Sequence, residues 1–194
     1  MQVLLVLAHP NPDSFSHAIA DRGRQALESA GHTVHLLDLY ALGSPAAMSA
    51  EEHAAYQTND PIVSPMVAEH AALVKSCEAM VFVYPTWWSS QPAILKGWLE
   101  RVMVPGVAFV FNSRGKVRPG LGNIRRIVGI STYGSPRSYV HFVNDNGRRT
   151  LVRALHLNAW RSRTKWLGLY AIDTTTAAVR DAFLARVDRV LGAL

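Results

Sequence analysis

Short apolar runs alternate with segments of helical periodicity along this chain, and that alternation limits the folds open to it. Residues 1–8 (MQVLLVLA) form a first apolar run, residues 15–30 carry apolar side chains at helical spacing, and residues 33–38 form a second apolar run. Gly31 supplies a stop signal for the intervening helix. Because strand, helix and strand in this order connect parallel strands, the start of the chain predicts a parallel crossover unit.

The same pattern continues to the end of the chain. Further apolar runs occupy residues 79–84, 126–132 and 164–170, and segments of helical pattern occupy residues 66–76, 93–103, 147–158 and 176–191. Two longer excursions, residues 40–65 and 106–123, separate them, and long connections are usually functional. We predict one α/β domain over residues 1–194, a flavodoxin-like three-layer sandwich whose five-stranded parallel sheet, in the order 2-1-3-4-5, has helices on both faces.

Composition narrows the class of protein further. Hydrophobic residues make up 49% of the 194 and charged residues 18%, which excludes a disordered tail, a collagen-like fibre and a disulfide scaffold. A chain of this length folds without disulfides, and its one cysteine, Cys77, has no internal partner. The first apolar run is too short to cross a bilayer and lacks the basic start of a signal peptide. We therefore expect a cytoplasmic protein that does not insert into a membrane.

Charge is divided unevenly along the chain. Residues 1–112 contain five Lys/Arg and ten Asp/Glu, a net of −5, whereas residues 113–194 contain fifteen and four, a net of +11. A basic half is typical of proteins that bind nucleic acid, an anionic cofactor or an acidic partner surface. Nucleic acid is the least favoured of these, because the arginines are not interleaved with aromatic residues in a recognition module. The sequence therefore favours an anionic cofactor and an oppositely charged partner subunit.

The loop after the first predicted strand has the composition of an anion site. In sheets of this type, ligands bind beyond the carboxyl ends of the strands. His9, Ser14, Phe15 and Ser16 follow the first strand and lead directly into a predicted helix. Since a helix start offers free N–H groups and a positive dipole end, these residues predict a phosphate site. A capping role for Ser14 alone explains the same residues.

Two adjacent tryptophans follow the third predicted strand. The loop consists of Pro85, Thr86, Trp87, Trp88 and Ser89. Two indole rings in a loop are costly to leave in water, so they are expected to pack against a flat ring system such as a flavin. The alternative is core packing under the following helix, which we expect of at least one of the two. We expect Trp88 to lie nearer the ligand.

The loop after the fourth predicted strand is rich in small and hydroxyl residues. It contains Ser131, Thr132, Tyr133 and Gly134, followed by Tyr139. Small residues allow the backbone to approach a planar ligand, and the Tyr139 hydroxyl can donate to a developing anion. Alone this segment reads as an ordinary turn. Three such loops at one sheet edge predict a ligand site.

These segments resemble those of a known family. The chain is similar to the flavodoxin-like NAD(P)H:quinone oxidoreductases at residues 9–15 (HPNPDSF), 84–88 (YPTWW) and 92–98 (PAILKGW), the last being the most specific. Residues 131–134 (STYG) match the family's third signature in part, and Tyr139 matches it fully in spacing. The smaller bacterial members of this family include the ancillary oxidoreductases of potassium efflux systems.

The resemblance implies a dimeric flavoprotein that takes a hydride from NADH or NADPH and passes two electrons to a quinone or similar acceptor. One site serves both substrates in turn, in a ping-pong sequence, with FAD or FMN as the flavin. The residues implied are His9, Ser14, Phe15 and Ser16 at the flavin phosphate; Pro85, Thr86, Trp87, Trp88 and Ser89 beside the ring; and Ser131, Thr132, Tyr133 and Gly134 at its pyrimidine side. Tyr139 stabilises charge on the reduced flavin.

The chain departs from this family at positions close to the implied site. Asp145 stands where the better-known members have a histidine, and His141 is misplaced for that role, although an arginine such as Arg137 is a possible substitute. Tyr133 stands where a glycine is usual, which is expected to narrow the approach to the ring. Ser89 replaces a frequent aromatic residue and opens the pocket. These departures leave the flavin prediction intact and weaken the prediction of a quinone acceptor.

Two other functions are compatible with parts of the sequence. Residues 129–134 (GISTYG) resemble the nucleophile elbow of a serine hydrolase, with His156 available downstream, but Tyr133 occupies the position of the last glycine. The second alternative is a redox-sensing ancillary subunit that docks on a larger system, such as a membrane transporter, through basic residues 114–126 and 148–163. No spacing of Cys and His predicts a metal site.

Overall fold

Five parallel strands form the central sheet of the computed structural model, which describes residues 1–58 and 60–194; Asn59, in the first excursion, lies outside the described residues. The strands are β1 (Gln2–Leu7), β2 (Thr33–Asp38), β3 (Ala79–Pro85), β6 (Arg126–Thr132) and β7 (Arg163–Leu169). They lie in the order β2-β1-β3-β6-β7, and every neighbouring pair is parallel. The predicted order is therefore confirmed.

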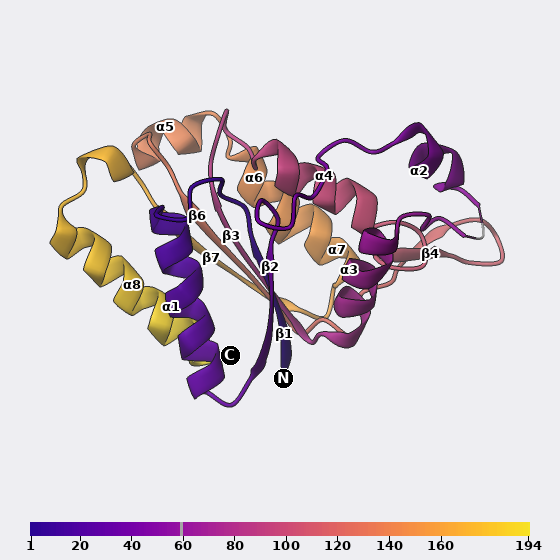
Figure 1. The fold of residues 1–194 in the computed structure, drawn as a ribbon, viewed down its shortest axis with the longest axis horizontal. Helices are drawn as coiled ribbons and strands as arrows, with labels where there is room; N and C mark the ends of the chain where they lie inside the picture. Colours follow the sequence, from indigo (N-terminus) through magenta and orange to yellow (C-terminus); the bar gives the residue numbers. More distant parts are fainter. Residues whose placement is uncertain (59) are drawn as a thin grey trace.

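Helices cover both faces of the sheet (Figure 1). On one face lie α1 (Phe15–Ser29) and α8 (Ala177–Leu191), which pack against each other. On the other lie α3 (Pro65–Ser76), α4 (Ala93–Val102) and a helical stretch composed of α6 (Asn146–Arg149), the π-helix η1 (Thr150–Leu155) and α7 (His156–Asn158). The three layers match the sandwich predicted from the alternation of apolar and helical segments.

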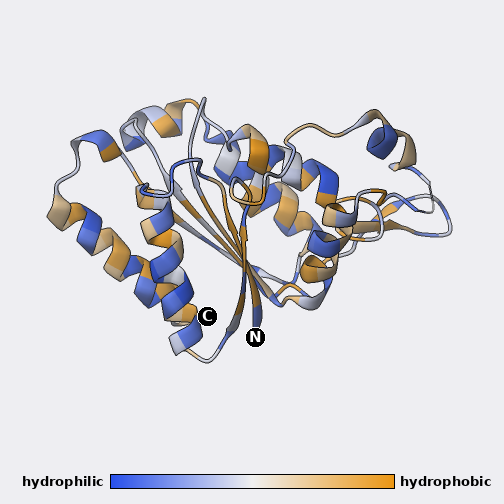
Figure 2. Cartoon of the chain, viewed as in Figure 1, coloured by the Kyte–Doolittle hydropathy of each residue, from blue (hydrophilic) through white to orange (hydrophobic). Residues whose placement is uncertain are grey.

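Both faces of each central strand are buried, which is why these strands are continuous apolar runs in the sequence. In β1, Leu4 and Val6 belong to the core under α3 and α4, whereas Leu5 and Leu7 belong to the core under α1 and α8. Figure 2 shows the strands as a largely hydrophobic band between amphipathic helices. Full burial of one such side chain stabilises the folded state by roughly 1.5–3 kcal/mol. Strand β1 contributes such side chains to the cores on both faces of the sheet.

Gly97 shows why the most specific sequence run of this chain requires a glycine. A Cβ atom at this position of α4 would lie 1.7 Å from the carbonyl oxygen of Ala46. The excursion after β2 therefore rests directly on the α4 backbone. Arg101, one turn later, fixes the same excursion by donating to Glu52 Oε1 at 2.8 Å and to the Pro45 carbonyl at 2.9 Å. The hydrogen bond from Arg101 lowers the pKa of Glu52.

The connecting segments contain further structure. The first excursion contains α2 (Ala50–Ala55). The second contains a hairpin of β4 (Phe109–Phe111) and β5 (Val117–Pro119), which the sequence did not predict. The segment after β6, expected to be a loop, is a helix, α5 (Arg137–Phe142), which begins after Pro136. Along residues 1–58 and 60–194, none of the helices is both long and apolar enough to traverse a bilayer.

His70 makes the stability of this core dependent on pH. It lies buried in α3, and its Nδ1 accepts a hydrogen bond from Trp98 Nε1 at 3.2 Å. Burial lowers the pKa of His70, so the unfolded chain binds this proton more readily than the folded chain. We therefore expect the free energy of unfolding to fall as the pH drops below about 6.5, by at most about 1.4 kcal/mol per pH unit for one proton.

Urea titrations between about pH 7 and pH 5 test this expectation. His70→Asn keeps an acceptor near Nδ1 and removes the titrating group, so its stability should decline less steeply than that of the wild type. The exposed His53 on α2 provides the matched control, because His53→Asn removes a histidine while leaving the buried contact between His70 and Trp98 intact. Equal slopes in the wild type and His70→Asn would contradict a contribution from His70.

Candidate functional site

Three strand ends and the loops that follow them meet at one edge of the sheet. Pro85 of β3 is paired in register with Thr132 of β6. The Thr86 amide donates to the Thr132 carbonyl at 2.8 Å, and the Thr86 and Ser131 hydroxyls are hydrogen-bonded at 2.8 Å. The Tyr133 amide donates to the Leu169 carbonyl of β7 at 2.8 Å. Backbone pairing thus continues past the strands and brings the predicted loops together.

A first cavity, of about 420 Å³, lies beside the start of α1 and is called the α1 cavity here. Its lining residues come from four loops: His9, Phe15, Ser16, Pro85, Thr86, Trp87, Thr132, Gly134, Ile172 and Asp173. Within the described chain, the amide N–H groups of Phe15 and Ser16 meet no protein acceptor, as expected for the first turn of a helix. The cavity therefore has free donors and the positive end of a helix dipole at one side.

His9 lies at the rim of the α1 cavity with its ring held by the neighbouring backbone. The Asn11 amide donates to His9 Nδ1 at 3.1 Å. Burial lowers the pKa of His9, so the ring is neutral at neutral pH. His9 Nδ1 also lies 3.2 Å from the Asn11 carbonyl oxygen, and in the tautomer that accepts from the Asn11 amide the proton is on Nε2, which is then a donor.

The start of α1 is fixed by a chain of polar contacts that the sequence analysis did not identify. Ser14 caps the helix by accepting from the His17 amide at 3.3 Å. Its hydroxyl also contacts His17 Nδ1 at 3.0 Å, and His17 Nε2 lies 3.1 Å from Asp38 Oδ2 at the end of β2. Ser14 thus has the capping role that was the alternative, and it is not among the residues that line the α1 cavity, whereas Phe15 and Ser16 are. The sequence signal for this contact was Asp38, because a polar residue at the end of a predicted strand lies at the edge of the sheet where the loops meet.

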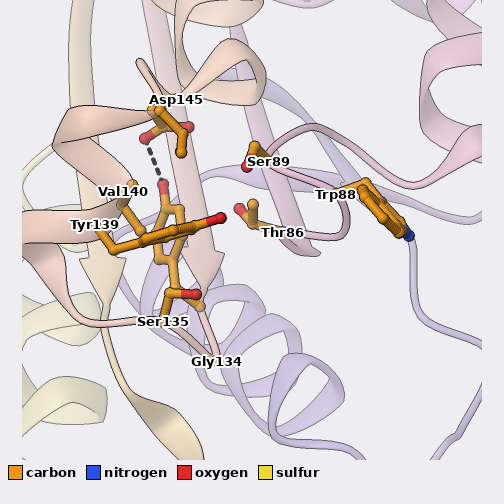
Figure 3. A pocket seen from close by; sticks show the side chains of 10 residues that line it. Thr86, Trp88, Ser89, Gly134, Ser135, Tyr139, Val140 and Asp145 are labelled. Atoms are coloured by element: carbon orange, nitrogen blue, oxygen red, sulfur yellow. Dashed lines mark hydrogen bonds between the residues drawn. The ribbon is translucent and has the colours of Figure 1, made fainter.

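A second cavity, of about 210 Å³, adjoins the first and is called the Tyr139 cavity here. It shares Thr86 and Gly134 with the α1 cavity. Its remaining lining residues are Trp88, Ser89, Tyr133, Ser135, Tyr139, Val140, Val143 and Asp145. In Figure 3, Tyr139 extends from α5 across the cavity. The unpredicted helix α5 is therefore the element that presents this hydroxyl group.

Tyr133 faces inward and does not project across the site as expected. Its side chain is 1% exposed, and its hydroxyl donates to Asp145 Oδ2 at 2.8 Å. Its ring stacks on Tyr170 with centroids 4.6 Å apart. Burial, with the nearby Asp145 carboxylate, raises the pKa of Tyr133 far above its ordinary value, so the hydroxyl keeps its proton. Hence Asp145, at the position of the family's histidine, is engaged by Tyr133.

The two tryptophans are both exposed, so the expectation that one of them enters the core was wrong. Trp87 is 41% exposed and lines the α1 cavity, with its ring 6.0 Å from that of His9. Trp88 is fully exposed, and Figure 3 shows it directed away from the other labelled side chains. The reason is local: Trp88 and Ser89 both have positive φ angles, of 48° and 57°, which turn the loop outward before α4.

Backbone strain is concentrated at this edge of the sheet. Among the described residues, the non-glycine positions with positive φ are Trp88, Ser89, Asn144, Asp145 and Ala171. All of them lie in loops that follow β3, α5 or β7. Such conformations cost of order 1–3 kcal/mol each and accumulate at functional sites. The strain therefore marks the same edge as the two cavities.

The hydrolase alternative has no support in the geometry. Ser131 is 1% exposed, and its hydroxyl is paired with that of Thr86. His156, its candidate base, instead contacts the Ser162 hydroxyl at 3.1 Å. The nearly complete elbow motif is thus a strand end whose serine has no histidine partner in the described chain.

Comparison with known proteins places the chain in a family. A family model described as a flavodoxin-like fold (Flavodoxin_2) matches residues 1–191, and the chain therefore belongs to this flavodoxin-like family. An uncharacterized NAD(P)H oxidoreductase of Haemophilus influenzae is 36% identical over 110 residues, which cover 56% of this chain and 54% of the relative.

Two further relatives extend the comparison. NAD(P)H dehydrogenase (quinone) 1 of Cavia porcellus is 29% identical over 155 residues, covering 71% of this chain and 55% of the relative. The chain thus spans about half the length of these curated relatives. A solved NAD(P)H:quinone oxidoreductase of Methanothermobacter marburgensis superposes with a TM-score of 0.82 at 25% identity, covering 99% and 96% of the two chains. The resemblance noted in the sequence is confirmed.

Proposed function

We propose that the protein is a flavin-dependent NAD(P)H oxidoreductase that reduces quinones or similar aromatic acceptors. The observation that carries the proposal is the α1 cavity, because it joins free helix amides to a wall of tryptophan and small residues at the switch point of an α/β sheet. The names of the relatives support the same chemistry. The three cofactor-site loops act within a single domain, residues 1–194.

The donor set of the α1 cavity fits a flavin phosphate. The Phe15 and Ser16 amides, the Ser16 hydroxyl and His9 Nε2 offer neutral donors at the positive end of a helix. Ser14 holds this first turn in place through its cap and its contact with His17. The chemistry of these groups suits an anion without demanding a charged side chain.

The remaining loops fit the flat ring of the same cofactor. Gly134, Thr132 and Thr86 leave room at the edge of the sheet, while Pro85, Trp87 and Ile172 supply apolar surface. When bound, a flavin supplies hydride acceptance from NADH or NADPH and two-electron transfer to the acceptor. Asp173, which the sequence did not place at the flavin site, lines this cavity and is suited to accept from a hydroxyl group.

Tyr139 is the residue that we propose to act on the reacting ring. It is half-exposed and lines the smaller cavity together with Thr86 and Gly134, which are shared with the cofactor cavity. From this position its hydroxyl donates a hydrogen bond to negative charge that develops there. Tyr133 does not fill this role, because its proton is committed to Asp145.

The absorbance spectrum of the purified protein tests the proposal. We expect a yellow protein whose flavin bands are bleached by NADH or NADPH under anaerobic conditions and restored by a quinone. An acceptor panel of quinones, nitroaromatics and azo dyes then ranks the acceptors. A protein that remains colourless after incubation with FAD and with FMN would overturn the proposed function. Size-exclusion chromatography across a salt series tests the accompanying expectation of a homodimer.

A further inference from the structure

A third cavity, of about 230 Å³, continues the row of cavities beyond Tyr139 and is lined by basic side chains. We call it the arginine cavity; its lining residues are Arg137, Val140, His141, Asn144, Asp145, Arg148, Arg149, Val152, Arg153 and Tyr170. It shares Val140 and Asp145 with the Tyr139 cavity. Helix α5 stands between the two, with Tyr139 lining one side and Arg137 and His141 lining the other.

The four guanidinium groups of this cavity have no acidic partner in the described part of the chain. The one carboxylate in the lining, Asp145, is only 8% exposed and already accepts from the Tyr133 hydroxyl at 2.8 Å and from the Arg148 amide at 3.2 Å. Positive charges that converge without neutralisation repel one another, and they raise the local concentration of anions. A bound anion would therefore reduce the repulsion among these positive charges.

The backbone around the cavity is shaped in an unusual way. Arg153 and Val152 belong to the π-helix η1, a conformation that is rare and occurs frequently at functional sites. Asn144 and Asp145, which directly precede α6, both have positive φ angles, of 75° and 36°. Both irregularities lie in the segment that carries Arg148, Arg149 and Arg153, and the side chains of these three residues line one cavity.

We propose that the arginine cavity binds an oxyanion, a sulfonate, carboxylate or phosphate group, carried by a substrate whose aromatic ring occupies the Tyr139 cavity. Planar guanidinium groups bind such oxyanions through paired hydrogen bonds. The volume of about 230 Å³ accommodates an acidic substituent beside the four guanidinium groups. The proposal deepens the proposed function, on which it rests, by naming the class of substrate: an aromatic compound with an acidic group close to its ring.

Two substrates of the proposed reaction carry an oxyanion that this cavity would bind. One is an acceptor with an acidic substituent, and the other is the pyrophosphate of the nicotinamide donor. The variant Arg149→Gln/Arg153→Gln removes two of the guanidinium groups while leaving Tyr139 and the α1 cavity intact. Arg186→Gln/Arg189→Gln, on exposed positions of α8, changes the net charge equally on the opposite face of the sheet and serves as the matched control.

A binding measurement tests the subsite without turnover. Calorimetric titration of the protein with naphthalene-2-sulfonate and with its neutral isostere naphthalene-2-sulfonamide measures the preference for the charged group. We expect the wild type and the α8 control to prefer the sulfonate, and Arg149→Gln/Arg153→Gln to lose that preference by at least about tenfold, as expected for charge-assisted hydrogen bonds. Equal preference in all three proteins would overturn the proposal.

Kinetics on the flavin-loaded enzyme then identify the source. If the acceptor carries the oxyanion, kcat/KM for 1,4-naphthoquinone-2-sulfonate falls at least about tenfold in the double variant, while that for 1,4-naphthoquinone stays within about twofold. If the donor carries the oxyanion, the rate of flavin reduction by NADH, measured without an acceptor, falls at least about tenfold in the double variant, and kcat/KM for both naphthoquinones stays within about twofold. A wild type that binds the sulfonate but is not reduced by NADH or NADPH contradicts the proposed function and leaves the subsite standing. Reducible enzymes with unchanged kinetics for every substrate contradict the subsite.

Discussion

Ser16→Asp should empty the flavin site without unfolding the protein. Ser16 lies in the first turn of α1, is 2% exposed and lines the α1 cavity. A carboxylate at this position competes with a phosphate for the same helix amides and repels it. Two like charges about 4 Å apart interact by roughly 4 kcal/mol in a partly polar site, so we expect flavin affinity to fall on the order of 100-fold or more.

The matched control for this change is Ser16→Asn, which has the same size and no charge. Acidic residues are favourable in the first turn of a helix, so Ser16→Asp should retain the thermal stability of Ser16→Asn. Fluorescence titration of each apoprotein with FMN and with FAD gives the affinities. Similar flavin affinities in the two variants would show that the phosphate does not bind at the start of α1.

Tyr139→Phe should slow turnover while the flavin remains bound. Tyr139 lines its cavity from α5, away from the helix amides that we assign to the phosphate. Removing one positioned donor from a developing anion typically costs a factor of about 100 or more, and less where water can replace the donor. Since Tyr139 is half-exposed, we expect kcat to fall by roughly tenfold to a hundredfold with little change in flavin content.

Rapid mixing of NADH with the flavin-loaded variants separates this effect from binding. Tyr56→Phe, a loss of the same hydroxyl beside the remote helix α2, is the control and should react at the wild-type rate. If Tyr139→Phe lost its flavin as completely as Ser16→Asp, the separate roles given to the two residues would be wrong.

The sequence predicted the sheet well because burial on both faces leaves a strong record. Residues 79–84 form a continuous apolar run and residues 127–130 (IVGI) a shorter one, and the structure has strands there, β3 and β6. The hairpin of β4 and β5 and the helix α5 were missed for a physical reason. Helix α5 has six residues, too few for a clear period, and its start after Pro136 reads equally well as a turn.

The sequence predicted the edge of the sheet at which the cavities lie, but not how their lining side chains are arranged. The strand-end rule located the loops containing Ser16, Trp87 and Thr132, all of which line the α1 cavity. The directions in which individual side chains point were harder to predict from the sequence, as the exposed Trp88 and the buried Tyr133 show. The cavity lined by Arg137, Arg148, Arg149 and Arg153 is formed by α5, the strained turn before α6 and the π-helix η1, and none of these has a clear sequence signal.

The central strands are apolar on both sides, and this has a consequence for how the chain finds its alignment. When one face of a strand is polar, a register shift of one residue buries polar side chains and exposes apolar ones. Strands β1 and β3 have apolar side chains on both faces, so such a shift costs them less burial energy. Hydropathy alone therefore tolerates several alignments. The bonds from Ala8 to Val83 and from Thr86 to Thr132, just beyond the strands, help to select one alignment. The loops that line the cavities thus also help to fix the register of the strands in the sheet.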